Sequence, residues 1–287
     1  MNNKKNKYHR VLIYLAIILL CIFILAPYIW LFICSISYRV DLTSIPLRWI
    51  PENINLENYE QIFFGNNATS NSTNRSLRYG LVNSLVIAGT STLICLAIGS
   101  LAAYAFTRLK FRGKITLFSI ILATQFIPLV VIIIPLYMVM STLGLLNTRL
   151  ALIIANCSFI LPLIIWLMYG FFLGVPKDLE EVARIDGCSR FGTIFRIMIP
   201  LSLSGLTASG IFAFVISWNE FFTAFILSST IKSKTISVLI SEYSSKVGVD
   251  YVAMAAAGVI ASLPPIVIAI IFQKYIIQGL TAGAVKG

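Results

Sequence analysis

Charged residues are scarce in this sequence. Asp, Glu, Lys and Arg together make up only 11% of its 287 residues, whereas soluble domains carry about 25%. Hydrophobic residues account for 58% of the chain, and the mean hydropathy is +0.90. This composition excludes an ordinary soluble protein and predicts a chain that lies in a lipid bilayer.

Side chains that carry chemistry are also rare. His9 is the only histidine, which argues against a histidine-based metal or proton site. The five cysteines form no CxxC motif, and four of them fall within apolar runs, so we interpret them as small buried residues. The sequence contains neither G-x4-G-K-[ST] nor HExxH. It therefore supplies no ATP-binding loop of its own, and an intramembrane enzyme is disfavoured.

Long apolar runs are what the chain has instead. A membrane-spanning helix needs about 20 apolar residues, and six runs satisfy this. We predict an all-α membrane protein with transmembrane helices TM1 (11–37), TM2 (79–107), TM3 (115–140), TM4 (150–173), TM5 (200–227) and TM6 (251–275). The remaining segments are a basic tail (1–10), an extracytoplasmic segment (38–78), a loop (176–199) and a C-terminal tail (276–287). TM1 is too long for a cleaved signal peptide, so we expect it to remain in the protein.

The net charge of +11 is distributed in a way that argues against binding to nucleic acid. Basic residues gather before TM1 and directly after TM2: Lys4, Lys5, Lys7 and Arg10, then Arg108, Lys110, Arg112 and Lys114. Because Lys and Arg mark the cytoplasmic loops of membrane proteins, we expect both termini and the 176–199 loop to be cytosolic. The basic residues thus indicate orientation in the bilayer.

The most polar stretch of the second half is Glu181–Pro200, which reads EVARIDGCSRFGTIFRIMIP. Pro176 favours a helix start, and Asp178 with Glu181 is placed to form a capping box. Gly187 suits the left-handed residue that ends a helix, and Ser189 can cap another. The sequence therefore predicts two short helices joined by a sharp bend at the membrane surface.

The spacing within this stretch is specific. Glu181-Val182-Ala183, three residues, Gly187, nine residues and Ile197-x-Ile199-Pro200 resemble the E-A-A-x3-G-x9-I-x-L-P loop of ABC importer permeases. Val182 and Ile199 depart from that pattern but stay apolar. In this family the loop is a coupling helix that sits in a cleft of the cytosolic ATPase. The resemblance implies such a role for Glu181, Ala183, Ile185, Asp186, Gly187, Phe191, Phe195 and Pro200. Glu181 is expected to pair with a basic or amide donor.

Two further stretches narrow the resemblance to the carbohydrate importers. The segment Ser217–Phe221 (SWNEF) and the tail QGLTAGAVKG at 278–287 are similar to those of maltose-type sugar permeases. This implies a type I ABC importer permease fold in a bacterial cytoplasmic membrane. It also implies a second permease subunit, a dimeric cytosolic ATPase subunit that binds ATP and Mg, and an extracytoplasmic sugar-binding lipoprotein or periplasmic protein. No cofactor is expected in this chain itself.

Polar residues and prolines inside the apolar runs indicate a transport path. TM3 and TM4 contain prolines (Pro128, Pro135 and Pro162) and are expected to be broken, which is tolerated only where protein or water satisfies the backbone. The candidate path residues are Gln125, Asn156, Trp218, Asn219 and Glu220. Glu220 is expected inside a TM5 helix that continues to Leu227. Because an acid at the bilayer centre costs about 2.5–3.5 kcal/mol, it should face the bundle or water. Lining the outer cavity and fixing the helix packing both remain open as its role.

The coupling role that the resemblance implies requires the 176–199 loop to be stiff. Changing the ratio of inward-facing to outward-facing permease from 1:99 to 99:1 takes about 5.5 kcal/mol of differential binding. Only a rigid loop that fits closely into the ATPase can transmit that free energy. The alternative function is an ion-coupled secondary transporter that acts without an ATPase. Such a carrier is expected to have paired acids in the membrane, or unwound Gly-rich helices in two matching halves of the sequence. No such repeat is visible in the sequence.

Overall fold

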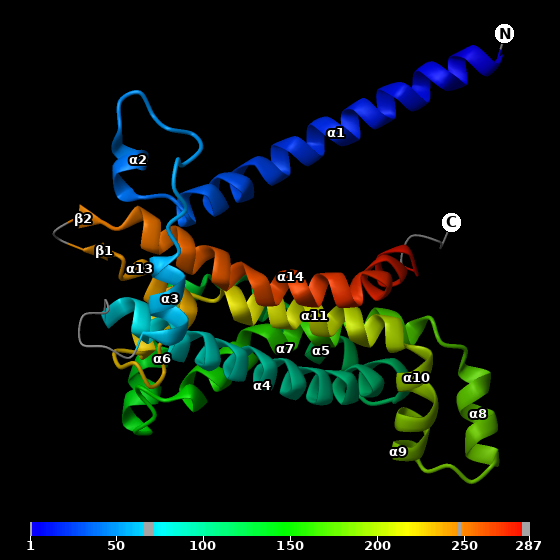
Figure 1. Ribbon diagram of the computed structural model, residues 1–287. Coiled ribbons are helices and arrows are strands. Elements are labelled where there is room, and N and C mark those ends of the chain that lie inside the picture. Colours follow the sequence, from blue (N-terminus) through cyan, green and yellow to red (C-terminus); the bar gives the residue numbers. More distant parts are fainter. Residues whose placement is uncertain (1, 66–71, 246–247, 283–287) are drawn as a thin grey trace. The chain divides into compact units, whose positions relative to one another are not determined.

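The computed structural model describes residues 2–65, 72–245 and 248–282. The described chain is almost entirely helical (Figure 1). It divides into two compact units, one formed by Met1–Arg78 with Ile240–Ser262 and the other by Tyr79–Leu239 with Leu263–Gly287. Two long helices, α4 (Ser72–Arg108) and α14 (Tyr251–Ala282), contribute to both units.

The first unit contains α1 (Asn2–Ser35), α2 (Arg39–Thr43), α3 (Glu57–Phe64) and the hairpin of β1 (Ser244–Ser245) and β2 (Gly248–Val249). Asn74 joins its parts and is only 1% exposed. Its amide donates to the side-chain oxygens of Asn58 (3.1 Å) and Gln61 (2.8 Å), and its oxygen accepts from the Tyr243 hydroxyl (2.6 Å). A fully partnered amide of this kind fixes α3, the start of α4 and the chain before β1 to one another.

The second unit holds most of the remaining helices. After α4 come α5 (Lys114–Ala123), the 3-10 turn η1 (Thr124–Phe126), α6 (Leu129–Thr142), α7 (Arg149–Leu173), α8 (Lys177–Ile185), α9 (Arg190–Thr193), the π-helical turn η2 (Ile194–Met198), α10 (Ile199–Leu201), α11 (Leu203–Asn219), α12 (Phe222–Leu227) and α13 (Ile236–Ser241). In Figure 1, α8, α9 and α10 project from one end of the bundle that α4, α7 and α11 form.

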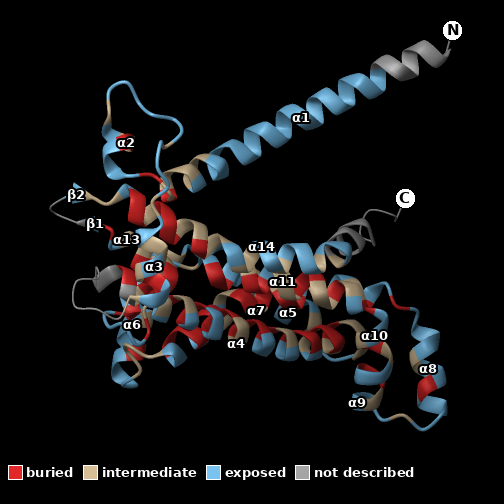
Figure 2. Cartoon of the chain, in the orientation of Figure 1, coloured by how far each residue is buried: buried red, intermediate tan, exposed pale blue. Residues whose placement is uncertain are grey.

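The core of the second unit follows α7, which has buried residues along its whole length and packs against α11, α5 and α12. Figure 2 shows this buried band running through α7 and the neighbouring faces of α4 and α11. Small residues allow the close approach, as is usual between membrane helices. At Gly99 an added Cβ would lie 2.8 Å from a methyl group of Ile164.

Four described helices are long and apolar enough to cross a membrane: His9–Ser35, Ser76–Arg108, Arg149–Leu173 and Tyr251–Tyr275. Two bent helix pairs raise the number to six if each is one span. The predicted break in TM3 is one of these bends. The chain turns by 98° between α5–η1 and α6, where Ile127 is extended before Pro128. A proline disfavours helical geometry at the residue before it, which accounts for the position of the break.

Two expectations about helix continuity are wrong. Pro162 does not break TM4, because α7 is one unbroken helix that contains it. TM5 is not one helix as far as Leu227, because α11 ends at Asn219, Glu220 is extended and α12 begins at Phe222. The C-terminal tail is helical as far as Ala282, and residues 283–287 lie outside the described residues.

The packing of α7 on α11 predicts a sharp difference between two glycines. A Cβ at Gly205 would lie 2.2 Å from Cγ of the Phe171 ring, so Gly205→Ala is expected to lower the free energy of unfolding by about 1–3 kcal/mol. Gly89 has no such neighbour within 4 Å, so Gly89→Ala should not destabilise. Thermal unfolding of both variants in detergent measures this. Equal melting temperatures would contradict the packing described here.

Candidate functional site

Two short helical limbs joined by a tight turn form the elbow (residues 176–200), as the sequence predicts. The first limb is α8, and Gly187 follows it with φ +85°. The backbone N–H groups of Gly187 and Cys188 donate to the carbonyls of Arg184 (3.2 Å) and Ala183 (2.9 Å), which closes the end of α8. The left-handed conformation expected at Gly187 is confirmed.

The second limb begins at Ser189, whose hydroxyl oxygen accepts from the N–H of Gly192 at 3.1 Å. This N-cap is as predicted. The limb continues through α9, the π-helical turn η2 and α10, and then bends by 83° into α11. The capping box expected at Asp178 and Glu181 is wrong, because α8 has Pro176 at its N-cap and no side-chain cap bond there.

Large apolar side chains on the elbow point outward. Ile185 is 84% exposed, Phe191 66% and Phe195 59%, and the neighbouring charged residues Glu181 and Asp186 are also exposed. Ala183 differs from what we expected of a docking residue, since it is only 5% exposed and packs inside the chain. Exposed aromatic and aliphatic side chains clustered on a polar projection are typical of a surface that another protein covers.

The elbow is attached to the bundle through Glu180, a residue that the sequence did not single out. Its carboxylate forms an ion pair with Arg108 (Nε to Oε2, 3.3 Å) and accepts a hydrogen bond from the Tyr104 hydroxyl. The same guanidinium donates to the carbonyls of Val175 (2.6 Å) and Phe172 (3.2 Å) at the end of α7. The side chains of Arg108 and Glu180 are only 4% and 13% exposed. The end of α4 therefore holds both the end of α7 and the start of the elbow.

Adjacent carboxylates thus have opposite surroundings, because successive residues on an α-helix point about 100° apart. Glu180 faces the bundle and Glu181 faces outward. The sequence does contain a signal for this ion pair. Arg108 stands at the end of the TM2 helix, and two adjacent acids, Glu180 and Glu181, stand near the start of the elbow. Pattern alone does not say which of the two acids turns inward.

Three of the five candidate path residues lie around the middle of α7 and its contact with α11. Asn156 is 4% exposed and donates to the Ser217 hydroxyl at 2.9 Å. Trp218 is 3% exposed and stacks on Phe214, with ring centroids 5.6 Å apart. Gln125 is exposed and donates to the carbonyl of Phe159, one turn beyond Asn156 (2.9 Å).

The other two, Asn219 and Glu220, occupy the break between α11 and α12. Asn219 is exposed and donates to the carbonyl of Val215 at 2.9 Å. The Glu220 carboxylate accepts from the N–H groups of Thr223 (2.6 Å) and Ala224 (3.1 Å), so it caps α12. A charged cap at a helix start is stabilising. This geometry accounts for the break in TM5 and supports the packing role for Glu220.

A family model described as "Binding-protein-dependent transport system inner membrane component" matches residues 95–282, about two thirds of the chain. The chain belongs to this family. It is therefore a multi-pass membrane protein and a permease subunit, and not itself an enzyme.

Individual relatives span nearly the whole chain. The sulfoquinovosyl glycerol transport system permease protein SmoH of Agrobacterium fabrum is 35% identical, covering 92% of this chain and 89% of its own. The trehalose/maltose transport system permease protein MalG of Thermococcus litoralis is 34% identical, covering 97% of both. A crystal structure of a bacterial ABC transporter involved in the import of the acidic polysaccharide alginate matches with TM-score 0.78, at 20% identity over 94% of this chain and 97% of that one. The permease thus has the type I ABC importer fold.

The attachment of the elbow generates a prediction about neighbouring acids. Glu180→Gln leaves the buried Arg108 charge without its partner, so the free energy of unfolding should fall by about 3 kcal/mol. Glu181→Gln changes an exposed residue and should stay within about 0.5 kcal/mol of the parent. Thermal unfolding in detergent compares the two. A shift of similar size in both variants would show that the Arg108–Glu180 pair does not hold the elbow.

The Glu220 cap generates a second prediction. Glu220→Gln keeps one acceptor oxygen of the two and removes the charge, so we expect a loss of about 1 kcal/mol in stability. Thermal unfolding in detergent compares the variant with the parent. An unchanged melting temperature would show that the contacts of Glu220 with the N–H groups of Thr223 and Ala224 do not stabilise the start of α12.

Proposed function

We propose that this permease subunit belongs to an ATP-driven importer of a carbohydrate of oligosaccharide size. An extracytoplasmic binding protein delivers the substrate, and the elbow docks into a cytosolic ATPase dimer that binds ATP and Mg. A second permease subunit completes the membrane path. In this proposal both termini and the elbow lie in the cytosol, which the basic residues at 1–10 and 108–114 support.

The observation that carries this proposal is the exposed apolar edge of the elbow. Burying Ile185, Phe191 and Phe195 against a partner would remove from water a set of side chains that the chain itself leaves open. The elbow is also stiff, since Gly187 and Ser189 close its turn by backbone and capping hydrogen bonds. Closure of the ATPase would therefore move the elbow as one piece, and the Arg108–Glu180 pair would pass that movement to α4 and α7.

The substrate class is supported by what the relatives transport. SmoH is named for the transport of sulfoquinovosyl glycerol, and MalG for the transport of trehalose and maltose. The polar side chains of Gln125, Asn156 and Asn219 are amides, which donate to and accept from hydroxyl groups without carrying charge. We propose that Gln125 and Asn219, which are exposed, contact the substrate, while Asn156 and Trp218 hold the packing behind them.

We call this proposed role of the elbow, in which it passes the closure of the ATPase to α4 and α7, the lever. It is tested by changing the turn of the elbow. Gly187→Pro is incompatible with φ +85°, because proline requires a φ of about −65°. We expect ATP-driven uptake by the assembled importer in proteoliposomes to fall at least about 100-fold while the variant still inserts. Glu181→Lys, which reverses the exposed charge at the start of the docking surface, should have the same effect.

Lys177→Pro is the matched control, because the first helical position tolerates proline and Pro176 before it is already extended. Its uptake should stay within about twofold of the parent. Uptake that persists in Gly187→Pro would refute the lever. Uptake driven by an ion gradient in the absence of any ATPase would instead establish the secondary transporter.

A further inference from the structure

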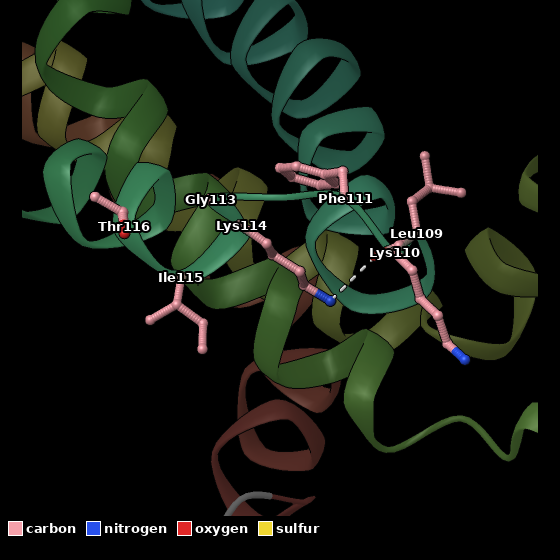
Figure 3. A pocket seen from close by; sticks show the side chains of 7 residues that line it. All are labelled: Leu109, Lys110, Phe111, Gly113, Lys114, Ile115 and Thr116. Atoms are coloured by element: carbon pink, nitrogen blue, oxygen red, sulfur yellow. Dashed lines mark hydrogen bonds between the residues drawn. The ribbon is translucent and has the colours of Figure 1, made fainter.

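The loop between α4 and α5 lines an open surface hollow that the proposed lever does not use. Its volume is about 460 Å³, and it is lined by Leu109, Lys110, Phe111, Gly113, Lys114, Ile115 and Thr116. This volume lies within the range of about 300–1,000 Å³ that is usual for ligand pockets. Figure 3 shows the loop folding over from the end of α4 to the start of α5. No acidic side chain is among the lining residues.

Positive charge gathers in this hollow without an internal counter-charge. The Lys114 ammonium donates to the carbonyl of Leu109 at 3.4 Å, which holds the side chain across the loop (Figure 3). Lys110 is exposed and extends toward the same side of the loop in this view. Arg108, at the end of α4, is paired with Glu180. Lys110 and Lys114 are the charged side chains among the described residues that line the hollow.

The backbone adds to the positive potential. Gly113 is the N-cap of α5, has φ +77° and carries no capping side chain. The first N–H groups of any α-helix have no acceptor within the helix, and the helix dipole makes this end positive. Two lysines and an uncapped helix start around one hollow are a combination that binds phosphate groups.

Apolar side chains at the rim indicate which phosphate would bind. Ile115 is 81% exposed and Phe111 is 40% exposed, and both line the hollow. A soluble phosphate gains nothing from these side chains, whereas a phospholipid places acyl chains beside its headgroup. The hollow also follows directly on the apolar helix Ser76–Arg108, so it lies at one end of a candidate membrane span.

We propose that this hollow binds the phosphate headgroup of an anionic phospholipid. Lys110, Lys114 and the first N–H groups of α5 bind the phosphate, and Phe111 and Ile115 lie along the acyl chains. The ion pair of Arg108 with Glu180 joins the end of α4, where this loop begins, to α8 of the elbow. The lipid would therefore lie next to the attachment of the elbow. The assignment to the cytoplasmic leaflet rests on the proposed function, whereas lipid binding itself does not.

Direct lipid binding tests the proposal. The assembled importer is reconstituted in nanodiscs of phosphatidylcholine with a minor fraction of phosphatidylglycerol, and co-purifying lipid is quantified by native mass spectrometry. We expect phosphatidylglycerol to be enriched about tenfold over phosphatidylcholine. The double variant Lys110→Ala/Lys114→Ala should abolish this enrichment.

Arg112→Ala is the matched control, because Arg112 lies in the same loop and is exposed but does not line the hollow. Enrichment should stay within about twofold of the parent. If Arg112→Ala removes as much enrichment as the double lysine variant, the loop attracts lipid only by its total charge and the site does not exist. Displacement of the lipid by millimolar inorganic phosphate would overturn the lipid assignment in favour of a free anion.

A second variant keeps the proposal testable if the double lysine variant fails to insert into the membrane. Ile115→Glu keeps both lysines and places an acid in the first turn of α5, where it favours the helix. The carboxylate replaces an apolar contact with the acyl chains and repels the nearby phosphate, so phosphatidylglycerol enrichment should fall at least about fivefold. Unchanged enrichment in a folded Ile115→Glu protein would contradict the proposed place of Ile115 beside the bound lipid. Uptake is measured in parallel, so that failure of the transport lever and failure of the lipid site are read separately.

Discussion

One buried ion pair determines where the elbow stands. Arg108 at the end of α4 holds the Glu180 carboxylate of α8 and two carbonyls at the end of α7, with both charged side chains almost fully covered. Charges taken out of water are costly unless each is paired and hydrogen-bonded. The arrangement therefore tolerates few alternatives, and it joins the elbow to the ends of α4 and α7.

Breaks in the helices lie around α7, while α7 itself is continuous. The 98° bend before α6 leaves Gln125 exposed against α7, and the break after α11 exposes Asn219 while Glu220 caps the next helix. An unpaired backbone group in a bilayer costs several kcal/mol, so such breaks occur where side chains or a water-lined path supply partners. A continuous α7 with interrupted neighbours is thus a rigid centre for the proposed path.

The basic loop after TM2 has more than one physical role. Its charges are consistent with a cytoplasmic orientation, Arg108 is withdrawn into the ion pair, and Lys110 with Lys114 lines the hollow at the start of α5. Charges of the same sign, a few residues apart, therefore act in different surroundings. The difference depends on the turn at Gly113, which directs the chain from the end of α4 into α5.

By itself, the sequence determined the membrane class, the broken TM3, the turn at Gly187 and the cap at Ser189. These follow from apolar run length and from residues whose backbone preferences are local, such as proline before a break and glycine at a positive φ. Tertiary structure alone decided that Glu180 and not Glu181 turns inward and that Ala183 is buried. Those outcomes depend on which partner a side chain meets across helices far apart in sequence. A local pattern in the sequence carries no information about that partner, because packing and desolvation are properties of the assembled helix bundle.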